Sequence, residues 1–75
     1  MSNTLTELDL EELAAWLRRR GYAEGTVRAV LSKLQKLRRY EDPKAFAESR
    51  KSAKQRKGYR YALRLAYEFL EAKGG

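Results

Sequence analysis

The 75-residue chain has no cysteine and no histidine. Their absence excludes disulfide bonds, thiol nucleophiles and zinc sites of the usual Cys/His type. A hydrolase or transferase would have only carboxylates or a lysine of perturbed pKa to work with. No glycine-rich phosphate-binding loop is present either, because Gly21 and Gly25 are isolated from one another. We therefore expect a domain that is not an enzyme by itself and needs no cofactor or metal.

Long apolar runs are also missing. No stretch approaches the roughly 20 apolar residues of a membrane span, and no basic segment precedes an apolar one as in a secretory signal. These absences predict a soluble, unexported protein that does not bind membranes. Apolar and polar residues nowhere alternate over five positions in a β-rich composition, so the expected fold class is all-α.

Acidic residues are scarce and unevenly placed. The chain has 17 Lys plus Arg against 10 Asp plus Glu, a formal net charge of +7. Four of the acids lie in the first twelve residues, where there is no base, whereas residues 49–67 contain seven bases and no acid. A small domain with this charge distribution is expected to meet a polyanion.

Hydrophobic spacing predicts two helices in the first half of the chain. The first begins at Asp9, which has the capping-box spacing to Glu12, and ends at Gly21 as a left-handed residue. The second spans about residues 26–39. Their expected core positions are Leu10, Leu13, Ala14, Leu17, Val27, Val30, Leu31, Leu34 and Leu37.

Two more helices are predicted after Asp42, which caps a short helix over residues 43–49 anchored by Phe46, Ala45 and Ala47. Ser52 begins the long helix over residues 53–72. Its expected core stripe is Tyr59, Ala62, Leu63, Ala66, Phe69 and Leu70. Residues 1–8 are predicted to be a flexible lead-in and residues 9–73 a single domain.

The faces opposite the core carry the candidate binding residues. On the long helix they are Lys54, Lys57, Tyr61 and Arg64, flanked by Arg60 and preceded by Arg50 and Lys51. On the second helix they are Arg28, Ser32, Lys36 and Arg39. Each residue alone is ordinary solvated surface. Together, bases one and two turns apart match a phosphate track, and Tyr61 could stack on a sugar or hydrogen-bond a phosphate. The joint pattern favours nucleic acid as the partner.

The order of these segments resembles a known family. The first helix reads LEELAAWLRRRG, the second TVRAVLSKL, a short helix starts at Asp-Pro, and the long helix reads YRYALRLAYEFL. This pattern is similar to the N-terminal core-binding domain of tyrosine recombinases, including phage integrases and their archaeal relatives. The resemblance covers about residues 9–73 through loose hydrophobic motifs.

The resemblance implies a four-helix, orthogonal, SAM-like bundle that closes over one side of duplex DNA in DNA integration and recombination. The second and fourth helices of such domains face the DNA. The interface that the resemblance implies is Thr26, Arg28, Ser32, Lys36, Lys54, Lys57, Tyr61 and Arg64. The charge pattern adds Lys51 and Arg60 to the candidate DNA-binding residues. The family usually has an aromatic residue where Val30 stands, and its catalytic tyrosine, arginines and histidine belong to a separate C-terminal domain. This chain is therefore not expected to recombine DNA by itself.

Three hypotheses remain open at this point. The first is a double-stranded DNA-binding module of the cytoplasm, associated with the nucleoid, whose other partners would be a C-terminal catalytic domain or further recombinase protomers. The second is a helical protein–protein interaction domain whose basic face meets an acidic partner. The third is an RNA-binding domain, which charge alone does not separate from the first.

Overall fold

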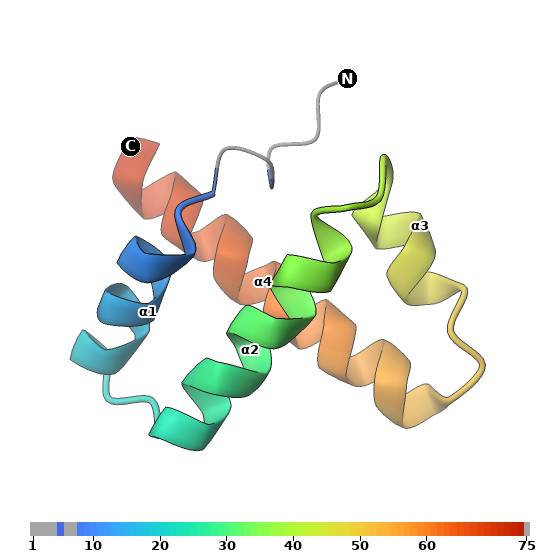
Figure 1. The fold of residues 1–75 in the computed structure, drawn as a ribbon, viewed down its shortest axis with the longest axis horizontal. Coiled ribbons are helices and arrows are strands. Elements are labelled where there is room, and N and C mark those ends of the chain that lie inside the picture. The colour runs from blue at the N-terminus through green and yellow to red at the C-terminus, as the bar shows by residue number, and fades with distance from the viewer. Residues whose placement is uncertain (1–4, 6–7, 75) are drawn as a thin grey trace.

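The computed structural model of the protein describes residue 5 and residues 8–74. Four α-helices and no strand occur in this part of the chain, so the all-α prediction is confirmed (Figure 1). They are α1 (Leu10–Arg19), α2 (Glu24–Leu37), α3 (Pro43–Glu48) and α4 (Ala53–Gly74). None of them is both long and apolar enough to cross a membrane.

Both ends of α1 form as predicted. The Oδ1 atom of Asp9 accepts hydrogen bonds from the backbone N–H groups of Glu11 at 2.9 Å and Glu12 at 3.2 Å. These bonds satisfy N–H groups that have no partner within the helix. At the other end, Gly21 has a φ of 91° and its N–H donates to the carbonyl of Arg18 at 3.0 Å. A residue without a Cβ adopts this left-handed conformation without strain, so the chain turns sharply into α2.

The N-terminal caps of α3 and α4 are also confirmed. The N–H of Ala45 donates to Oδ1 of Asp42 at 3.0 Å, and the N–H of Gln55 donates to Oγ of Ser52 at 3.4 Å. Side-chain caps of this kind define where a helix begins, because they replace the missing intrahelical acceptors.

Helix α2 begins and ends two residues before the expected span of about residues 26–39, and Thr26 lies in its first turn. The helix begins at Glu24, and its N-cap, Ala23, makes no side-chain cap hydrogen bond. Glu24 instead pairs with Arg18 of α1 across the turn, with Nη2 and Oε1 2.7 Å apart. The start of α2 therefore leaves no capping signal in the sequence.

The core contains most of the predicted apolar positions and several that were not predicted. Leu65 of α4 is only 2% exposed although it lies outside the expected stripe. Leu5 and Leu8 are buried too, while the rest of the predicted lead-in at residues 1–8 lies outside the described part of the chain. Ala45, expected to help anchor α3, is exposed, and Tyr67, outside the expected core stripe, is 44% exposed.

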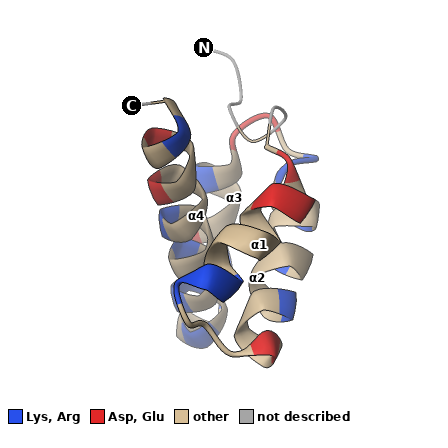
Figure 2. Cartoon of the chain, turned by 90° about the vertical axis from the view of Figure 1, so that its left-hand side faces the viewer, with Lys and Arg blue, Asp and Glu red and all other residues tan. Residues whose placement is uncertain are grey.

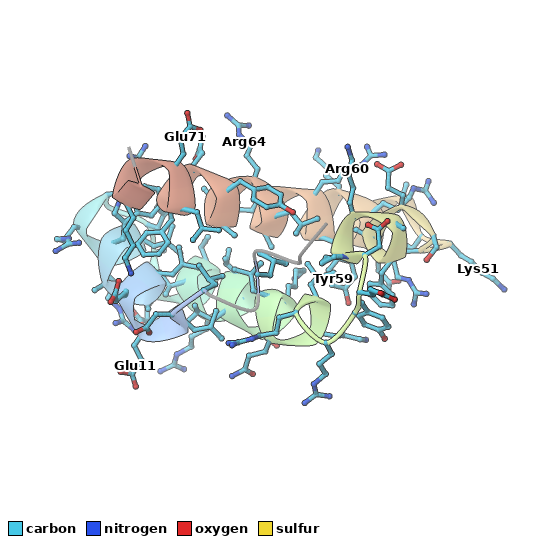
Figure 3. All side chains as sticks on the ribbon, turned by 90° about the horizontal axis from the view of Figure 1, so that it is seen from above. Glu11, Lys51, Tyr59, Arg60, Arg64 and Glu71 are labelled. Atoms are coloured by element: carbon cyan, nitrogen blue, oxygen red, sulfur yellow. The ribbon has the colours of Figure 1, made fainter. Side chains whose placement is uncertain are left out.

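The helices form two layers. In Figure 3, which looks along the layers, α4 lies on one side and α1 and α2 on the other. In Figure 1, α2 and α4 cross, α1 lies beside the C-terminal part of α4, and α3 lies beside its N-terminal part. Trp16 of α1 meets Phe69 of α4 edge to face at 5.5 Å, which fixes the α1 end of the bundle.

Candidate nucleic-acid interface

A groove of about 240 Å³ opens where the N-terminal half of α2 diverges from the N-terminal half of α4. We call it the α2/α4 groove. It is lined by Gly25, Thr26, Ala29, Val30, Lys33, Gly58 and Tyr61. Its walls are small or apolar apart from Thr26, Lys33 and Tyr61. Of the sequence-predicted site residues, the structure therefore brings Thr26 and Tyr61 together across two helices.

Lys33 is a residue of this groove that the sequence analysis missed. Its Cε atom lies 2.9 Å from the point that a Cβ on Gly58 would occupy, so the absence of a side chain at Gly58 lets Lys33 lie across α4. The neighbour of Gly58 is therefore a flexible side chain and not another backbone. In the sequence, Lys33 lies one helical turn after Ala29 and Val30, beside the core stripe, and this spacing could have indicated that it faces the groove.

Tyr61 stands at the edge of the groove and is 40% exposed. Partial burial raises the pKa of its hydroxyl, and the neighbouring Tyr22 raises this pKa further through charge and a side-chain hydrogen bond. The phenol therefore stays neutral through the physiological range, in which it can donate a hydrogen bond to an anion or offer its ring for stacking.

Three lysines around the N-terminal end of α4 have no counterion. Lys51, Lys54 and Lys57 are exposed and make no ion pair or hydrogen bond through their side chains within the described part of the chain. Helical spacing places Lys54 and Lys57 along the edge of α4 that carries Gly58 and Tyr61. In Figure 3, Lys51 projects outward at the loop that precedes the helix.

Two arginines of the same segment serve the fold instead. The Nη1 atom of Arg56 donates to the backbone carbonyls of Arg50 at 2.6 Å and Lys51 at 3.1 Å, which closes the loop before α4. The guanidinium of Arg50 lies over the ring of Phe46, 4.3 Å from its centroid. Counting bases in the sequence did not distinguish these structural arginines from the unpaired lysines.

Arg60 and Arg64 lie on a different side of α4 from the groove. Both point outward from the helix in Figure 3, and both line a second groove between α3 and α4. Arg60 approaches Glu48 of α3 at 3.4 Å, and Arg64 approaches Glu68 at 3.7 Å. The carboxylates just outside residues 49–67 therefore partly balance these two bases, although that stretch itself contains no acid.

The basic face predicted for α2 is spread out. Arg28 and Ser32 are exposed beyond the groove, and the charge of Arg28 helps to lower the pKa of Glu24, after the stronger effect of Arg18. Lys36 lies nearer to α3, with its Nζ 5.9 Å from the ring centroid of Phe46. None of these three residues lines the α2/α4 groove.

Charge is unevenly distributed along α4. Figure 2 shows Lys and Arg along its lower, N-terminal part and both signs on its upper part, with Asp and Glu also at the start of α1 and at the start of α2. The acidic residue nearest the groove in sequence, Glu24, is held by Arg18 at 2.7 Å. The N-terminal part of α4 therefore presents net positive charge to a partner, although Glu48 of α3 lies 3.4 Å from Arg60.

Within residues 5 and 8–74, no group of three or more carboxylates is placed to hold a metal ion. The arrangement can attract, orient and cover an anionic chain through unpaired cations, one neutral aromatic hydroxyl and a smooth groove floor. A scan against protein-family models and searches of curated proteins and solved structures each found no match to the chain.

Proposed function

We propose that this domain binds double-stranded DNA through α2 and the N-terminal half of α4. The observation that carries the proposal is a groove lined by Lys33 and the neutral Tyr61. Lys57 and Lys54, both without counterions among the described residues, lie one and two helical turns before Tyr61 on α4. Lysine is a compact, strongly hydrated cation that suits contacts with phosphates, where position matters more than planar geometry.

The groove floor suits a close approach by the DNA backbone. Gly25 has no heavy atom within 4 Å of a Cβ built on it, and Ala29 is exposed beside it. A sugar–phosphate strand can therefore approach the main chain of α2 while Thr26 and Tyr61 supply hydrogen bonds. Affinity would come mainly from released counterions, and any sequence preference from a few side chains at base edges or from DNA shape.

The resemblance to the core-binding domain of tyrosine recombinases gives this proposal a biological setting. A SAM-like bundle in DNA integration or recombination would use its second and fourth helices on the duplex, in keeping with the location of the α2/α4 groove. The domain would act on nucleoid DNA in the cytoplasm. Cleavage and rejoining would need a separate catalytic domain, with other recombinase protomers as further partners.

The test is fluorescence anisotropy of a labelled duplex of about 20 base pairs, titrated at about 50 and 200 mM salt. With about five to eight phosphates contacted, log K should fall with log salt at a slope of about −4 to −7. In the Lys54→Ala/Lys57→Ala variant the slope should be shallower by about two units. A Lys44→Ala/Lys73→Ala variant carries the same charge change outside the groove and should bind like the wild type.

Two results would overturn the proposal. One is no binding by the folded wild type at the lower salt concentration. The other is equal loss in the two double variants, which would mean that net charge and not the groove governs binding. An RNA duplex of the same length serves as the competitor, since an A-form helix has a deep, narrow major groove and a different backbone spacing. Tighter binding to RNA would replace DNA as the ligand.

A further inference from the structure

A second groove, of about 280 Å³, lies between α3 and α4. We call it the α3/α4 groove. Ala47, 0% exposed, and Leu63, 5% exposed, are the buried apolar residues of its lining, and Tyr67 lines it beside them. The charged residues of the lining are the bases Lys44, Arg60 and Arg64 and one acid, Glu48. The groove thus combines an apolar interior with an edge of net positive charge, on the side of α4 away from Tyr61.

Tyr67 is the most exposed large hydrophobic residue of the described chain, at 44%. It follows Leu63 by one helical turn, so its ring lies beside the apolar lining. Exposed aromatic residues next to an apolar hollow are typical of protein-binding surfaces, because they bury a large area at low cost in side-chain entropy.

The cations of the two grooves differ in kind. The α2/α4 groove and its edge carry lysines, whereas α4 contributes Arg60 and Arg64 to the α3/α4 groove. Arginine and tyrosine are enriched at the energetic centres of protein interfaces and lysine is depleted there. Arginine also binds a carboxylate through two parallel hydrogen bonds, which a lysine cannot do.

The ion pairs at this groove are loose. Arg60 and Glu48 approach to 3.4 Å and Arg64 and Glu68 to 3.7 Å, whereas the Arg18–Glu24 and Lys73–Glu12 pairs close to 2.7 Å. Both guanidinium groups are largely solvated, with 61% and 75% of their side chains exposed. An incoming carboxylate can therefore replace either intramolecular partner with little loss.

We propose that the α3/α4 groove binds an acidic amphipathic segment of another protein. One apolar side chain of that segment lies over Leu63 and against Tyr67, and flanking carboxylates bind Arg60, Arg64 and Lys44. The positive charge of the groove edge favours an acidic partner. The apolar lining favours a partner that also carries an apolar side chain to cover it. Because the two grooves lie on different sides of α4, DNA and the segment bind at the same time.

The probe is a synthetic peptide of about 15 residues with leucine or phenylalanine at every third or fourth position and glutamate between them. One control peptide has glutamine for each glutamate, and another has serine for each apolar residue. Nitrogen-15 NMR titration should show shifts at Ala47, Leu63 and Tyr67 with the first peptide only. Binding by the serine control as strongly as by the first peptide would reduce the interaction to charge attraction and overturn the proposal.

Matched variants locate the contact. Tyr67→Ala should weaken peptide binding about tenfold, as expected for an interface hot spot, and leave DNA affinity unchanged. Tyr61→Ala removes an equally exposed tyrosine from the other groove and should leave peptide binding unchanged. Equal losses in the two variants, or NMR shifts confined to the α2/α4 groove, would refute the α3/α4 site.

The same experiments separate the two proposals from each other. If the protein binds the peptide but not DNA, the DNA-binding proposal is overturned and the α3/α4 site stands. If it binds DNA but not the peptide, the α3/α4 site is overturned and the DNA-binding proposal stands. Sedimentation of the free domain adds one further outcome. Self-association that Tyr67→Ala abolishes would mean that a second copy of the chain occupies the groove, which overturns the assignment to another protein.

Discussion

The two parts of α4 differ in charge and in burial. Residues 53–61 contain four bases, no acid and no buried residue. Residues 62–74 contain two bases and two acids, and all five buried residues of the helix lie there. The sequence analysis predicted one helix with a core face and a binding face along its whole length. The structure shows that the helix is also divided along its axis, with the packing concentrated in its second part.

The largest expected effect tests the packing part of this comparison. Phe69→Ala removes a 5%-exposed ring that meets Trp16 at 5.5 Å and should lower the free energy of unfolding by about 3–5 kcal/mol. Urea denaturation followed by circular dichroism measures it. Tyr61→Ala, in the first part of the helix, should cost far less.

Such a loss could unfold a domain of this size outright. The milder Phe69→Leu variant should then remain folded and still cost more than Tyr61→Ala. Equal losses of unfolding free energy in the variants at Phe69 and Tyr61 would contradict the division of α4.

The next effect concerns charge. Glu68→Gln/Glu71→Gln raises the net charge by two units in the second part of α4, the same magnitude that Lys54→Ala/Lys57→Ala removes from the first. DNA affinity should change by less than about threefold in the former and by about tenfold or more in the latter. Anisotropy at two salt concentrations measures both. Equal and opposite changes would show that the protein responds to total charge only.

Gly58 offers a test in which stability and binding move in opposite directions. Alanine favours a helix interior by up to about 1 kcal/mol over glycine, and the only contact it would meet is the flexible end of Lys33 at 2.9 Å. Gly58→Ala should therefore raise stability slightly while displacing the Lys33 ammonium and weakening DNA binding severalfold.

A double-mutant cycle checks the cause of that weakening. In a Lys33→Ala background, Gly58→Ala should leave DNA affinity unchanged, because no ammonium remains to be displaced. A further loss in that background would mean that the methyl group itself obstructs the DNA.

The smallest effect is a dependence on alkaline pH. The pKa of Tyr61 is raised above its usual value of 10.0, chiefly by partial burial. The folded state therefore favours the neutral phenol, so this contribution to stability is complete below pH 10 and is lost as the pH rises through the folded-state pKa. The melting temperature of the wild type should fall relative to that of Tyr61→Phe as the pH rises from about 9 to 11.5. A constant difference would contradict the shift.

Local signals in the sequence predicted the helix ends well where a side chain makes the cap. Asp9, Asp42 and Ser52 cap as expected, and Gly21 ends α1 with a positive φ. The start of α2 carries no such signal, because its N-cap, Ala23, makes no side-chain cap hydrogen bond.

Among the candidate site residues, periodicity identified which side chains face away from the core but not which neighbours they meet. Tyr61 and Thr26 line one groove, whereas Arg60 and Arg64 line the other, although all four were predicted to share an interface. Lys33 was missed because it lies beside the core stripe, at the angle where α4 crosses. Helical spacing gives directions around one helix and carries no information on where the next helix passes.

The amino-acid sequence by itself determined the helices, the apolar stripes and the excess of positive charge, because caps, 3.6-residue periodicity and composition act over a few residues. The tertiary structure alone decided which cations remain unpaired. Packing brought Glu48 near Arg60, turned Arg56 onto backbone carbonyls, laid Lys33 over Gly58 and left Lys54 and Lys57 without partners. Each of these outcomes depends on the distance between groups on different segments, which only the folded chain fixes.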